Sequence, residues 1–368
     1  MVMATDIFVI GGGPAGLAAA IAARQRGFQV VVADGARPPI DKPCGEGLMP
    51  DGRAALAALG IHVPEEDSYP FRGIRFISGG LKVDAGFPSG GGIGVRRTAL
   101  HRLMVARAEA AGVSLLWQTP VTGLRSGGVR IGKDLVCSRW VIGADGGHSL
   151  TRRWAGLDRY HHNRTRFAFR RHYRVAPWSD CMELHWGADC QIYVTPVAAD
   201  EVCVALVSRD QHLRLEAALP CFPELARLLR DAEQTSTERG ATTWTRKLKK
   251  VYQGPVALVG DASGAIDSIT GEGLCLTFRQ AQLLAECLVE GNLRRYQQGH
   301  RALARRPAMM ASLMLALAWK SSFRQRVMRA FNSDPRLLQK MLAMHVGELS
   351  PTHFAANGLS LGLQLLRP

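Results

Sequence analysis

Three features are scarce or missing in this 368-residue sequence, and each absence excludes a class of protein. No run of about eighteen apolar residues is free of interruption, so we expect no membrane-spanning helix. None of the eight cysteines has C-x-x-C spacing, which argues against a zinc site and against a thioredoxin-type redox pair. A chain of this size without a disulfide framework is typical of a reducing compartment. We therefore expect a cytoplasmic protein without a bound metal.

Acidic residues are few relative to basic ones, since 31 Asp and Glu stand against 46 Lys and Arg. The excess is concentrated in residues 291–368, where ten Arg and two Lys stand against two acids, which gives 12 − 2 = +10. No nucleic-acid-binding motif accompanies this charge, so we expect no nucleic-acid partner. Two interpretations stay open for this region: a solvated helical surface, or a peripheral contact with a membrane surface or a partner protein. The sequence is compatible with a monomer and with a dimer.

The N-terminal stretch carries the strongest local pattern. Residues 7–10 (IFVI) form a short apolar run, which predicts a strand buried on both faces. Residues 17–26 are rich in Ala, a strong helix former, and residues 29–33 predict a second buried strand. Three glycines with the spacing G-x-G-x-x-G separate the first strand from the helix. Strand, glycine turn, helix and strand together predict a dinucleotide-binding unit.

Each glycine of the turn occupies a position where a side chain would interfere. Gly11 permits a tight turn, Gly13 lets the backbone approach a pyrophosphate, and Gly16 allows close packing of the helix on the strand. The helix N-terminus directs free N–H groups and a partial positive charge toward phosphates. Asp34 closes the second strand, at the distance expected of the acid that binds ribose hydroxyls. The predicted cofactor site comprises Gly11, Gly13, Pro14, Ala15, Gly16 and Asp34.

Two more glycine-and-acid segments follow directly after predicted buried strands. Residues 143–146 (GADG) follow one strand, and residues 260–264 (GDASG) follow another. Residues 270–273 (TGEG) then open a helix. Because ligands bind at the carboxyl ends of strands in an open α/β sheet, we expect all three sites to face one ligand. An acid there can orient sugar hydroxyls, and a glycine-rich helix start can donate N–H groups to phosphate or flavin oxygens.

These segments resemble a known superfamily. The stretch IGADGGHSLTR is similar to the D-G motif of group A flavoprotein monooxygenases, the para-hydroxybenzoate hydroxylase family, and VALVGDAS resembles their G-D motif. The resemblance covers roughly residues 5–290. It implies FAD as cofactor and residue roles by position: Arg97 against the FAD phosphates, Asp145 at the D-G motif, and Gly260 and Asp261 at the ribityl and pyrophosphate region. Gly271, Glu272 and Gly273 would border the isoalloxazine.

The same resemblance implies the fold class. We expect an α/β protein with a Rossmann-type FAD-binding domain, an inserted antiparallel β-sheet substrate domain and C-terminal helices; the alternating pattern of residues 165–208 agrees with such a sheet. The C-terminal region is predicted to be mostly helical, with breaks at Pro307 and at Asp334-Pro335. The expected segments are 1–70, 96–164 and 251–290 for the FAD-binding domain, 71–95 and 165–250 for the substrate sheet, and 291–368 for a basic C-terminal helical region.

The sequence departs from aromatic hydroxylases in two places. The G-D motif continues ASGAIDSITGEGL, and residues 42–47 read KPCGEG; both are more similar to geranylgeranyl reductases, which use reduced FAD to saturate prenyl double bonds. Flavin-dependent halogenases carry a W-x-W-x-I-P signature, which this sequence lacks. Cys44 has two interpretations of equal weight: a catalytic thiol that donates a proton or lines the active site, or a small packed residue in a turn.

The favoured function is monooxygenation, in which NAD(P)H reduces FAD and O₂ then hydroxylates an apolar aromatic or polyketide-like small molecule. Trp186, Tyr193 and Thr195 are the candidate substrate contacts, although aromatic residues in a sheet more often belong to the core. No second dinucleotide fingerprint occurs, which agrees with transient NAD(P)H binding and equally with another electron donor. The alternatives are an FAD-dependent reductase of isoprenoid or other alkene double bonds, and a non-catalytic flavin-binding protein that associates with membranes or partners.

Overall fold

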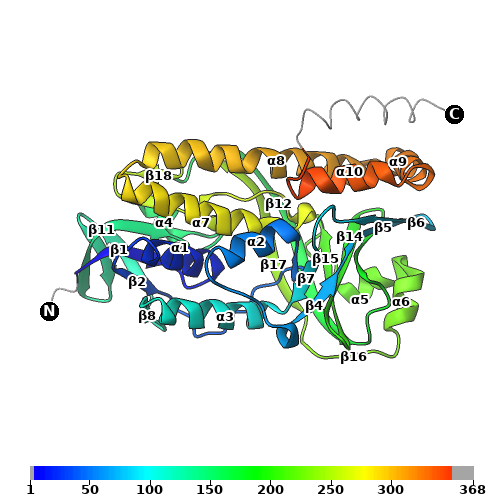
Figure 1. The fold of residues 1–368 in the computed structure, drawn as a ribbon, viewed down its shortest axis with the longest axis horizontal. Helices are drawn as coiled ribbons and strands as arrows, with labels where there is room; N and C mark the ends of the chain where they lie inside the picture. The colour runs from blue at the N-terminus through cyan, green and yellow to red at the C-terminus, as the bar shows by residue number, and fades with distance from the viewer. Residues whose placement is uncertain (1–3, 350–368) are drawn as a thin grey trace.

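The computed structural model describes residues 4–349, and the last part of the predicted basic region, residues 350–368, lies outside them. Two eight-stranded sheets stand at the two ends of an elongated molecule, and long helices run along one side of both (Figure 1). The arrangement is the predicted one: an α/β chain with an FAD-type sheet, an inserted largely antiparallel sheet and C-terminal helices.

The first sheet contains the glycine turn. Its central strand is buried on both faces from Ile7 to Ile10, as the β-branched and aromatic run predicts. This strand pairs in parallel with a strand on each side, and Ile10 lies opposite Ala33 and Gly143 in the two registers. The strands of this sheet are β1 (Ala4–Ile10), β2 (Val30–Ala33), β8 (Ser114–Leu116), β9 (Val121–Arg125), β10 (Gly128–Ile131), β11 (Asp134–Gly143), β18 (Tyr252–Gln253) and β19 (Val256–Leu258).

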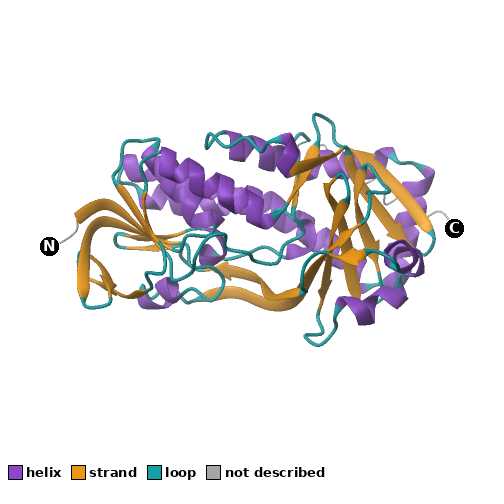
Figure 2. Cartoon of the chain, turned by 90° about the horizontal axis from the view of Figure 1, so that it is seen from below, coloured by secondary structure: helices purple, strands orange, loops and turns teal. Residues whose placement is uncertain are grey.

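The second sheet forms the far end of the molecule. Its strands are β5 (Gly73–Ser78), β6 (Leu81–Gly86), β12 (Tyr160–Arg174), β13 (Cys181–Trp186), β14 (Cys190–Ala198), β15 (Glu201–Ser208), β16 (Glu233–Gln234) and β17 (Arg239–Leu248). Strands β12 and β17 pair from Tyr160 to Arg170 and reach back toward the first sheet (Figure 2). A small third sheet joins β3 (Gly47–Leu48), β7 (Gly92–Val95) and β4 (Ser68–Phe71).

Ten α-helices connect and cover the sheets within residues 4–349. They are α1 (Pro14–Arg24), α2 (Pro50–Ala57), α3 (Arg97–Ala110), α4 (Leu150–Trp154), α5 (Leu215–Ala218), α6 (Pro223–Leu229), α7 (Gly273–Val289), α8 (Leu293–Trp319), α9 (Ser321–Ser333) and α10 (Arg336–His345). Short 3-10 helices are η1 (Glu65–Asp67), η2 (Leu219–Cys221), η3 (Gly260–Ser263) and η4 (Ser268–Thr270). None of the described helices is both long and apolar enough to cross a membrane.

One predicted helix break is wrong. Helix α8 continues through Pro307, whose missing N–H removes one intrahelical hydrogen bond. Pro307 is buried, and α8 buries Met310, Met314 and Leu317 in the following turns, so tertiary packing holds the helix together across the proline. The second predicted break is confirmed, because α9 ends at Ser333 and α10 begins after Pro335.

The C-terminal helices supply half of a hydrophobic core. The C-terminal part of α8 and helices α9 and α10 lie along the outer side of the second sheet (Figure 1). Met314 and Leu338 belong to the same buried cluster as Phe76 and Leu184 of the sheet. Burying a side chain of this size contributes about 1.5–3 kcal/mol. Much of this basic region is therefore bound to the second sheet through its apolar face, and its proposed external partners stay a prediction.

Candidate active site

A cavity of about 310 Å³ lies between the two sheets. We call it the main cavity. Its lining includes the glycine turn at the start of α1, the loop 42–47, the start of α3, the segment 144–146 after β11, the segment 260–273 that leads into α7, and parts of strands β12 to β15 and β17. The carboxyl ends of parallel strands β1 and β19 supply two of these walls, which is the edge where ligands bind in such sheets.

The glycine turn has the geometry that its spacing predicts. Gly11 has φ +109°, and a Cβ on Gly16 would lie 1.8 Å from the Gly11 carbonyl oxygen, so neither position tolerates a side chain. Gly13 has ordinary extended φ, lines the main cavity, and would place a Cβ with no atom within 4 Å. The turn is therefore closed toward the protein and open toward the cavity. Pro14 and Ala15 line the cavity beside Gly13.

Asp34 braces this turn. Its Oδ2 accepts a hydrogen bond from the Gly12 N–H at 2.6 Å, and its Oδ1 accepts from the Ala36 N–H at 2.7 Å. The carboxylate is half-buried and keeps lone pairs free for a further donor. Its predicted contact with ribose hydroxyls is compatible with this position, next to the turn but outside the lining of the main cavity.

A buried cation on the cavity wall fits the phosphates of FAD. Arg97, the first residue of α3, lines the cavity with 8% of its surface exposed, and its Nε is buried without a hydrogen-bond partner among the described residues. A buried guanidinium N–H without an acceptor is costly. An anionic pyrophosphate would supply that acceptor beside the helix N-terminus at Gly13. The residues present therefore fit FAD.

Asp261 faces the same cavity but is paired. Lys42 Nζ lies 2.5 Å from Asp261 Oδ2. Burial raises the pKa of Asp261, but Lys42, Arg97 and Arg246 together outweigh it, so the pKa lies below its usual value. The residue is ionised and ready to accept hydrogen bonds from sugar hydroxyls. Gly260 beside it has φ +61° and also lines the cavity.

Asp145 has a different set of contacts. Its Oδ1 accepts a hydrogen bond from Ser149 Oγ at 2.5 Å, and its Oδ2 accepts from the Thr151 N–H and Oγ1 at 2.9 and 3.0 Å. These bonds fix the start of α4. The neighbours Ala144 and Gly146 line the main cavity, whereas Asp145 does not. The D-G motif thus shapes the cavity through its backbone, and its carboxylate caps a helix.

The three predicted substrate contacts separate in the structure. Tyr193 lines the main cavity, and its hydroxyl donates to the Ile269 carbonyl at 2.8 Å. Trp186 lies in the core behind the cavity, 5.9 Å from the Phe76 ring, in an edge-to-face arrangement. Thr195 is fully buried and donates from Oγ1 to the Gly45 carbonyl at 2.7 Å. Only Tyr193 is placed to touch a ligand, and Thr195 holds the loop 42–47.

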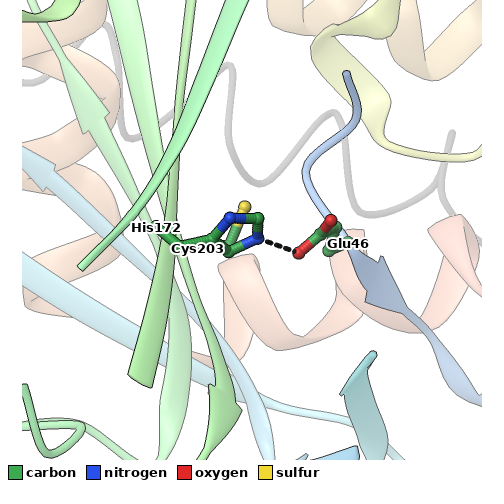
Figure 3. Close-up of side chains that lie close together, drawn as sticks. All are labelled: Glu46, His172 and Cys203. Carbon is green, nitrogen blue, oxygen red and sulfur yellow. Dashed lines mark hydrogen bonds and ion pairs between the residues drawn. The ribbon is translucent and has the colours of Figure 1, made fainter. Parts of the chain in front are cut away.

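A buried charged cluster fixes that loop. Glu46 has φ +58°, a conformation rare for a residue with a side chain, and only 4% of its surface is exposed. Its Oε1 accepts from the Arg97 backbone N–H at 2.9 Å, and its Oε2 bonds to His172 Nε2 at 2.6 Å (Figure 3). Burial raises the pKa of Glu46, but the hydrogen bond and charge of His172 and then the Arg170 guanidinium outweigh it. The net pKa is lowered, so Glu46 is an anion.

The same cluster contains the three potential metal-binding side chains Glu46, His172 and Cys203, whose ligand atoms lie within 4.8 Å of one another (Figure 3). Arg170 argues against a cation there. Its Nη1 lies 3.2 Å from His172 Nδ1, so a metal ion bound to the ring would lie close to a guanidinium that carries a permanent positive charge. The ion would also have to replace the hydrogen bond between His172 Nε2 and Glu46 Oε2. We interpret the cluster as an ion-pair network that positions the loop.

Two cavity-lining groups hold a proton at neutral pH. Burial raises the pKa of the Cys44 thiol by more than the Arg97 guanidinium lowers it. Burial and then the Asp51 carboxylate raise the pKa of Glu272 to about 8, against the lowering effect of Arg306 and Arg279. Gly271 and Gly273, on either side of Glu272, also line the cavity. The wall predicted to border the isoalloxazine therefore carries neutral acids rather than charges.

A second, smaller cavity of about 40 Å³ adjoins the main one. We call it the apolar side cavity. It lies between the second sheet and helices α8 and α10, and it shares Met182, Tyr193 and Thr270 with the main cavity. The other lining residues are Ile74, Phe76, Ala85, Leu184, Ile269, Met310, Met314, Leu338, Met341, Leu342 and His345.

Several site residues were missed by sequence reasoning. Lys42, Arg170 and His345 reach the site from segments far from their partners; Lys42 and Asp261, for example, are 219 positions apart. No local pattern marks such pairs. Alternation along β12 does place Arg170 and His172 on one face of the strand, which was the only available signal.

We expect the Asp261→Ala substitution to weaken FAD binding by about tenfold or more, because a charged hydrogen bond contributes roughly 1.5–3 kcal/mol. The measurement is FAD titration of the apoprotein by flavin fluorescence. Asp200→Ala, in an exposed turn of the second sheet, is the matched control and should bind FAD normally. An unchanged FAD affinity in Asp261→Ala would show that this carboxylate does not contact the cofactor.

Comparison with known proteins supports a flavoprotein. A family model described as an FAD binding domain matches residues 4–292. The chain is 28% identical over 327 residues to menaquinone reductase of Mycobacterium tuberculosis, covering 79% of this chain and 78% of the relative. It is 26% identical over 322 residues to digeranylgeranylglycerophospholipid reductase 1 of Methanothermobacter thermautotrophicus, covering 80% of each. Ubiquinone hydroxylase UbiM of Neisseria meningitidis is 24% identical over 332 residues, covering 80% and 70%.

The fold is shared with solved structures. A flavoprotein/dehydrogenase from Cytophaga hutchinsonii superposes with a TM-score of 0.83 at 19% identity, covering 98% of both chains. The family match spans the glycine turn, the acid after β19 and most of both sheets, which are the parts that build the main cavity. The chain therefore belongs to the FAD binding domain family, and it is an FAD-dependent oxidoreductase.

Proposed function

We propose that this protein reduces a carbon–carbon double bond of an isoprenoid lipid. The observation that carries the proposal is the apolar side cavity, which adjoins the main cavity at Met182, Tyr193 and Thr270. Eleven of its fourteen lining residues are aliphatic, Met or Phe. The hydroxyl of Tyr193 is occupied by the Ile269 carbonyl. Such a lining favours a hydrocarbon chain, because it offers little to orient a phenol or a carboxylate.

The side cavity is small, but its walls can adapt. Four of its lining residues are methionines, namely Met182, Met310, Met314 and Met341. Methionine is unbranched and flexible, and methionine-rich surfaces can repack around different apolar ligands. A prenyl chain that enters from the main cavity would displace these side chains rather than the sheet. Two of the relatives named above are a menaquinone reductase and a digeranylgeranylglycerophospholipid reductase, which agrees with such a substrate.

Hydroxylation was the function favoured by sequence reasoning, and it is the second candidate. The hydroxylase among the relatives supports it. Reduction is the better match because the loop 42–47 and the TGEG segment resemble geranylgeranyl reductases and because the cavity wall carries two neutral acids, Cys44 and Glu272. A double-bond reduction requires a proton at one carbon after hydride reaches the other.

The chain's residues have distinct tasks in this reaction. Arg97 and the N-terminus of α1 would bind the pyrophosphate, and Asp261 would bind sugar hydroxyls. FAD, once reduced by NAD(P)H or another donor, supplies the hydride. The second sheet and helices α8 and α10 hold the hydrocarbon chain and exclude water. A cavity-wall acid then adds the proton.

The test is a single-turnover reaction without oxygen. The purified holoprotein is reduced with dithionite, freed of excess dithionite and mixed anaerobically with a geranylgeranyl lipid that has no quinone ring, and the products are analysed by mass spectrometry. We expect a product heavier by two hydrogens and a reoxidised flavin. The hydroxylase alternative predicts no reaction until oxygen is added, followed by a product heavier by one oxygen. A protein that shows neither product with this lipid would contradict the proposed substrate class.

A further inference from the structure

The wall between the two cavities holds a buried acid that faces a buried imidazole. Glu272 is 4% exposed and His345 is 6% exposed. Glu272 precedes α7 and lines the main cavity, whereas His345 ends α10 and lines the apolar side cavity. Glu272 Oε2 and His345 Nδ1 lie 3.5 Å apart. Neither atom has a hydrogen-bond partner among the residues that the structure describes.

Two facing polar atoms left unpaired in a protein interior are expensive, at roughly 1–3 kcal/mol each. Contraction of the gap by about half an ångström would form a hydrogen bond between them. Catalytic hydrogen bonds are often long before the ligand is bound and shorten in the complex. The pair is thus placed to tighten when the cavities are filled.

We propose that Glu272 is the acid that protonates the substrate carbon and that His345 is the residue that positions it. This inference rests on the proposed function. FAD, when bound and reduced, would supply the hydride for one C–H bond; the π bond breaks, and its electron pair takes the Glu272 proton to form the other C–H bond. Glu272 is left as a carboxylate and regains its proton from water after the product leaves. The C-terminal helical region thereby contributes to the active site through α10.

The surroundings keep the pair neutral. From α2, Asp51 raises the pKa of Glu272 after the larger effect of burial, while Arg306 of α8 and Arg279 of α7 lower it, and the result is about 8. Asp51 is itself held by Arg306 at 3.4 Å and by the Cys275 thiol at 3.1 Å. Burial and Arg306 lower the pKa of His345 to about 4, against the raising effects of Asp51 and of a hydrogen bond with the Thr270 backbone. At neutral pH the carboxyl is therefore protonated and the ring uncharged.

The Cys44 thiol is the competing proton donor, and its pKa distinguishes it from Glu272. A donor works best when its pKa lies near the working pH. The pKa of Cys44 is raised above the ordinary thiol value of 9.0, whereas that of Glu272 is about 8. The thiol is thus the weaker acid. Its place in the fixed loop 42–47 suits it to packing against the ligand, so we expect Cys44→Ser to be mild.

The experiment measures anaerobic alkene reduction in three variants and a control. Glu272→Gln keeps the size and neutrality of the side chain, and we expect product formation to fall by about a hundredfold with normal FAD content. In His345→Gln the rate of product formation should fall by about tenfold, and in Cys44→Ser it should fall by less than about threefold. His212→Gln, on the surface, should match the wild type. In the wild type, the rate should decline as pH rises through about 8, and His345→Gln should shift that decline.

A second readout does not depend on turnover. Infrared difference spectra of the protein without FAD should show a protonated carboxyl band that disappears as pH rises through about 8, is missing in Glu272→Gln and moves in His345→Gln. A wild type that reduces alkenes while Glu272→Gln keeps its rate, or while Cys44→Ser alone loses it, overturns the assignment of Glu272. A wild type that reduces no alkene overturns the proposed function and this inference with it. If the carboxyl band is absent, or does not change with pH and in His345→Gln, the proposed roles of Glu272 and His345 are overturned even if alkene reduction is observed.

Discussion

The Gly13→Val variant is expected to fold but to be purified almost without FAD. A Cβ at Gly13 meets no atom within 4 Å, so the branched side chain projects into the main cavity and not into the protein. The backbone there is extended with φ −71°, which valine adopts readily. We estimate a cost of about 1 kcal/mol at this helix N-cap. That is small against a typical stability of roughly 5–15 kcal/mol.

The loss of FAD should be large because the same methyl groups occupy the space of the pyrophosphate. We expect the dissociation constant to rise by at least about a hundredfold, or ~2.7 kcal/mol. Gly13→Ala adds one methyl group and should give an intermediate value. Gly123→Val is the matched control: its Cβ also meets no atom within 4 Å, but it lies on β9, far from the cavity. Normal flavin content in purified Gly13→Val would contradict the cofactor site.

Sequence patterns correctly predicted those parts of the fold that are formed within a short stretch of the chain. The glycine turn, β1 and the acids after β11 and β19 follow from spacing and burial pattern, since each is formed within some thirty residues. Helix α8 was mispredicted at Pro307 because its stability comes from the second sheet, which no window of sequence contains. For Trp186 the sequence left a substrate contact and a core position open, because alternation gives its face of the strand but not what covers that face.

The site is less predictable than the fold because its electrostatics are assembled from distant segments. Asp145 illustrates the limit of a motif. The D-G segment lies where the resemblance implies, yet the carboxylate caps α4 and the backbone faces the cavity. Glu272 was predicted by position, whereas its partner His345 is separated from it by the whole of α7, α8 and α9. Burial keeps that pair neutral, and burial depends on the packed structure, so the sequence alone could not predict it.

Arg170→Met is expected to be the most destabilising of these substitutions. Arg170 is 2% exposed, and its Nη2 bonds to Asp41 Oδ1 at 2.5 Å while its Nε lies 3.9 Å from Glu46 Oε1. Removing one member of a buried ion pair leaves an uncompensated charge, and this typically costs about 3–5 kcal/mol. Asp41 retains Arg239 at 2.9 Å, so Glu46 bears most of the loss. Urea unfolding at neutral pH measures the change.

The pH dependence identifies the responsible group. In the wild type the lowered pKa of Glu46 contributes stability that is present above its ordinary value of 4.5 and lost as pH falls through the folded value. Without Arg170 the folded pKa of Glu46 rises, so the deficit of Arg170→Met should be full at neutral pH and shrink as the medium is acidified below about 4.5.

Two variants separate this effect from the mere loss of an arginine. Arg174→Met, on the same strand, removes a side chain that is 58% exposed and pairs with Glu233 at 3.0 Å, and it should cost less than about 1 kcal/mol. Adding Glu46→Gln to Arg170→Met should restore part of the lost stability, because the amide needs no counter-charge; contacting pairs couple by about 0.5–3 kcal/mol. Two results would contradict this interpretation: equal losses of stability in Arg170→Met and Arg174→Met, or a double variant no more stable than Arg170→Met. Either would mean that Glu46 does not depend on Arg170 for its charge and that another contact holds the loop 42–47 against the cavity.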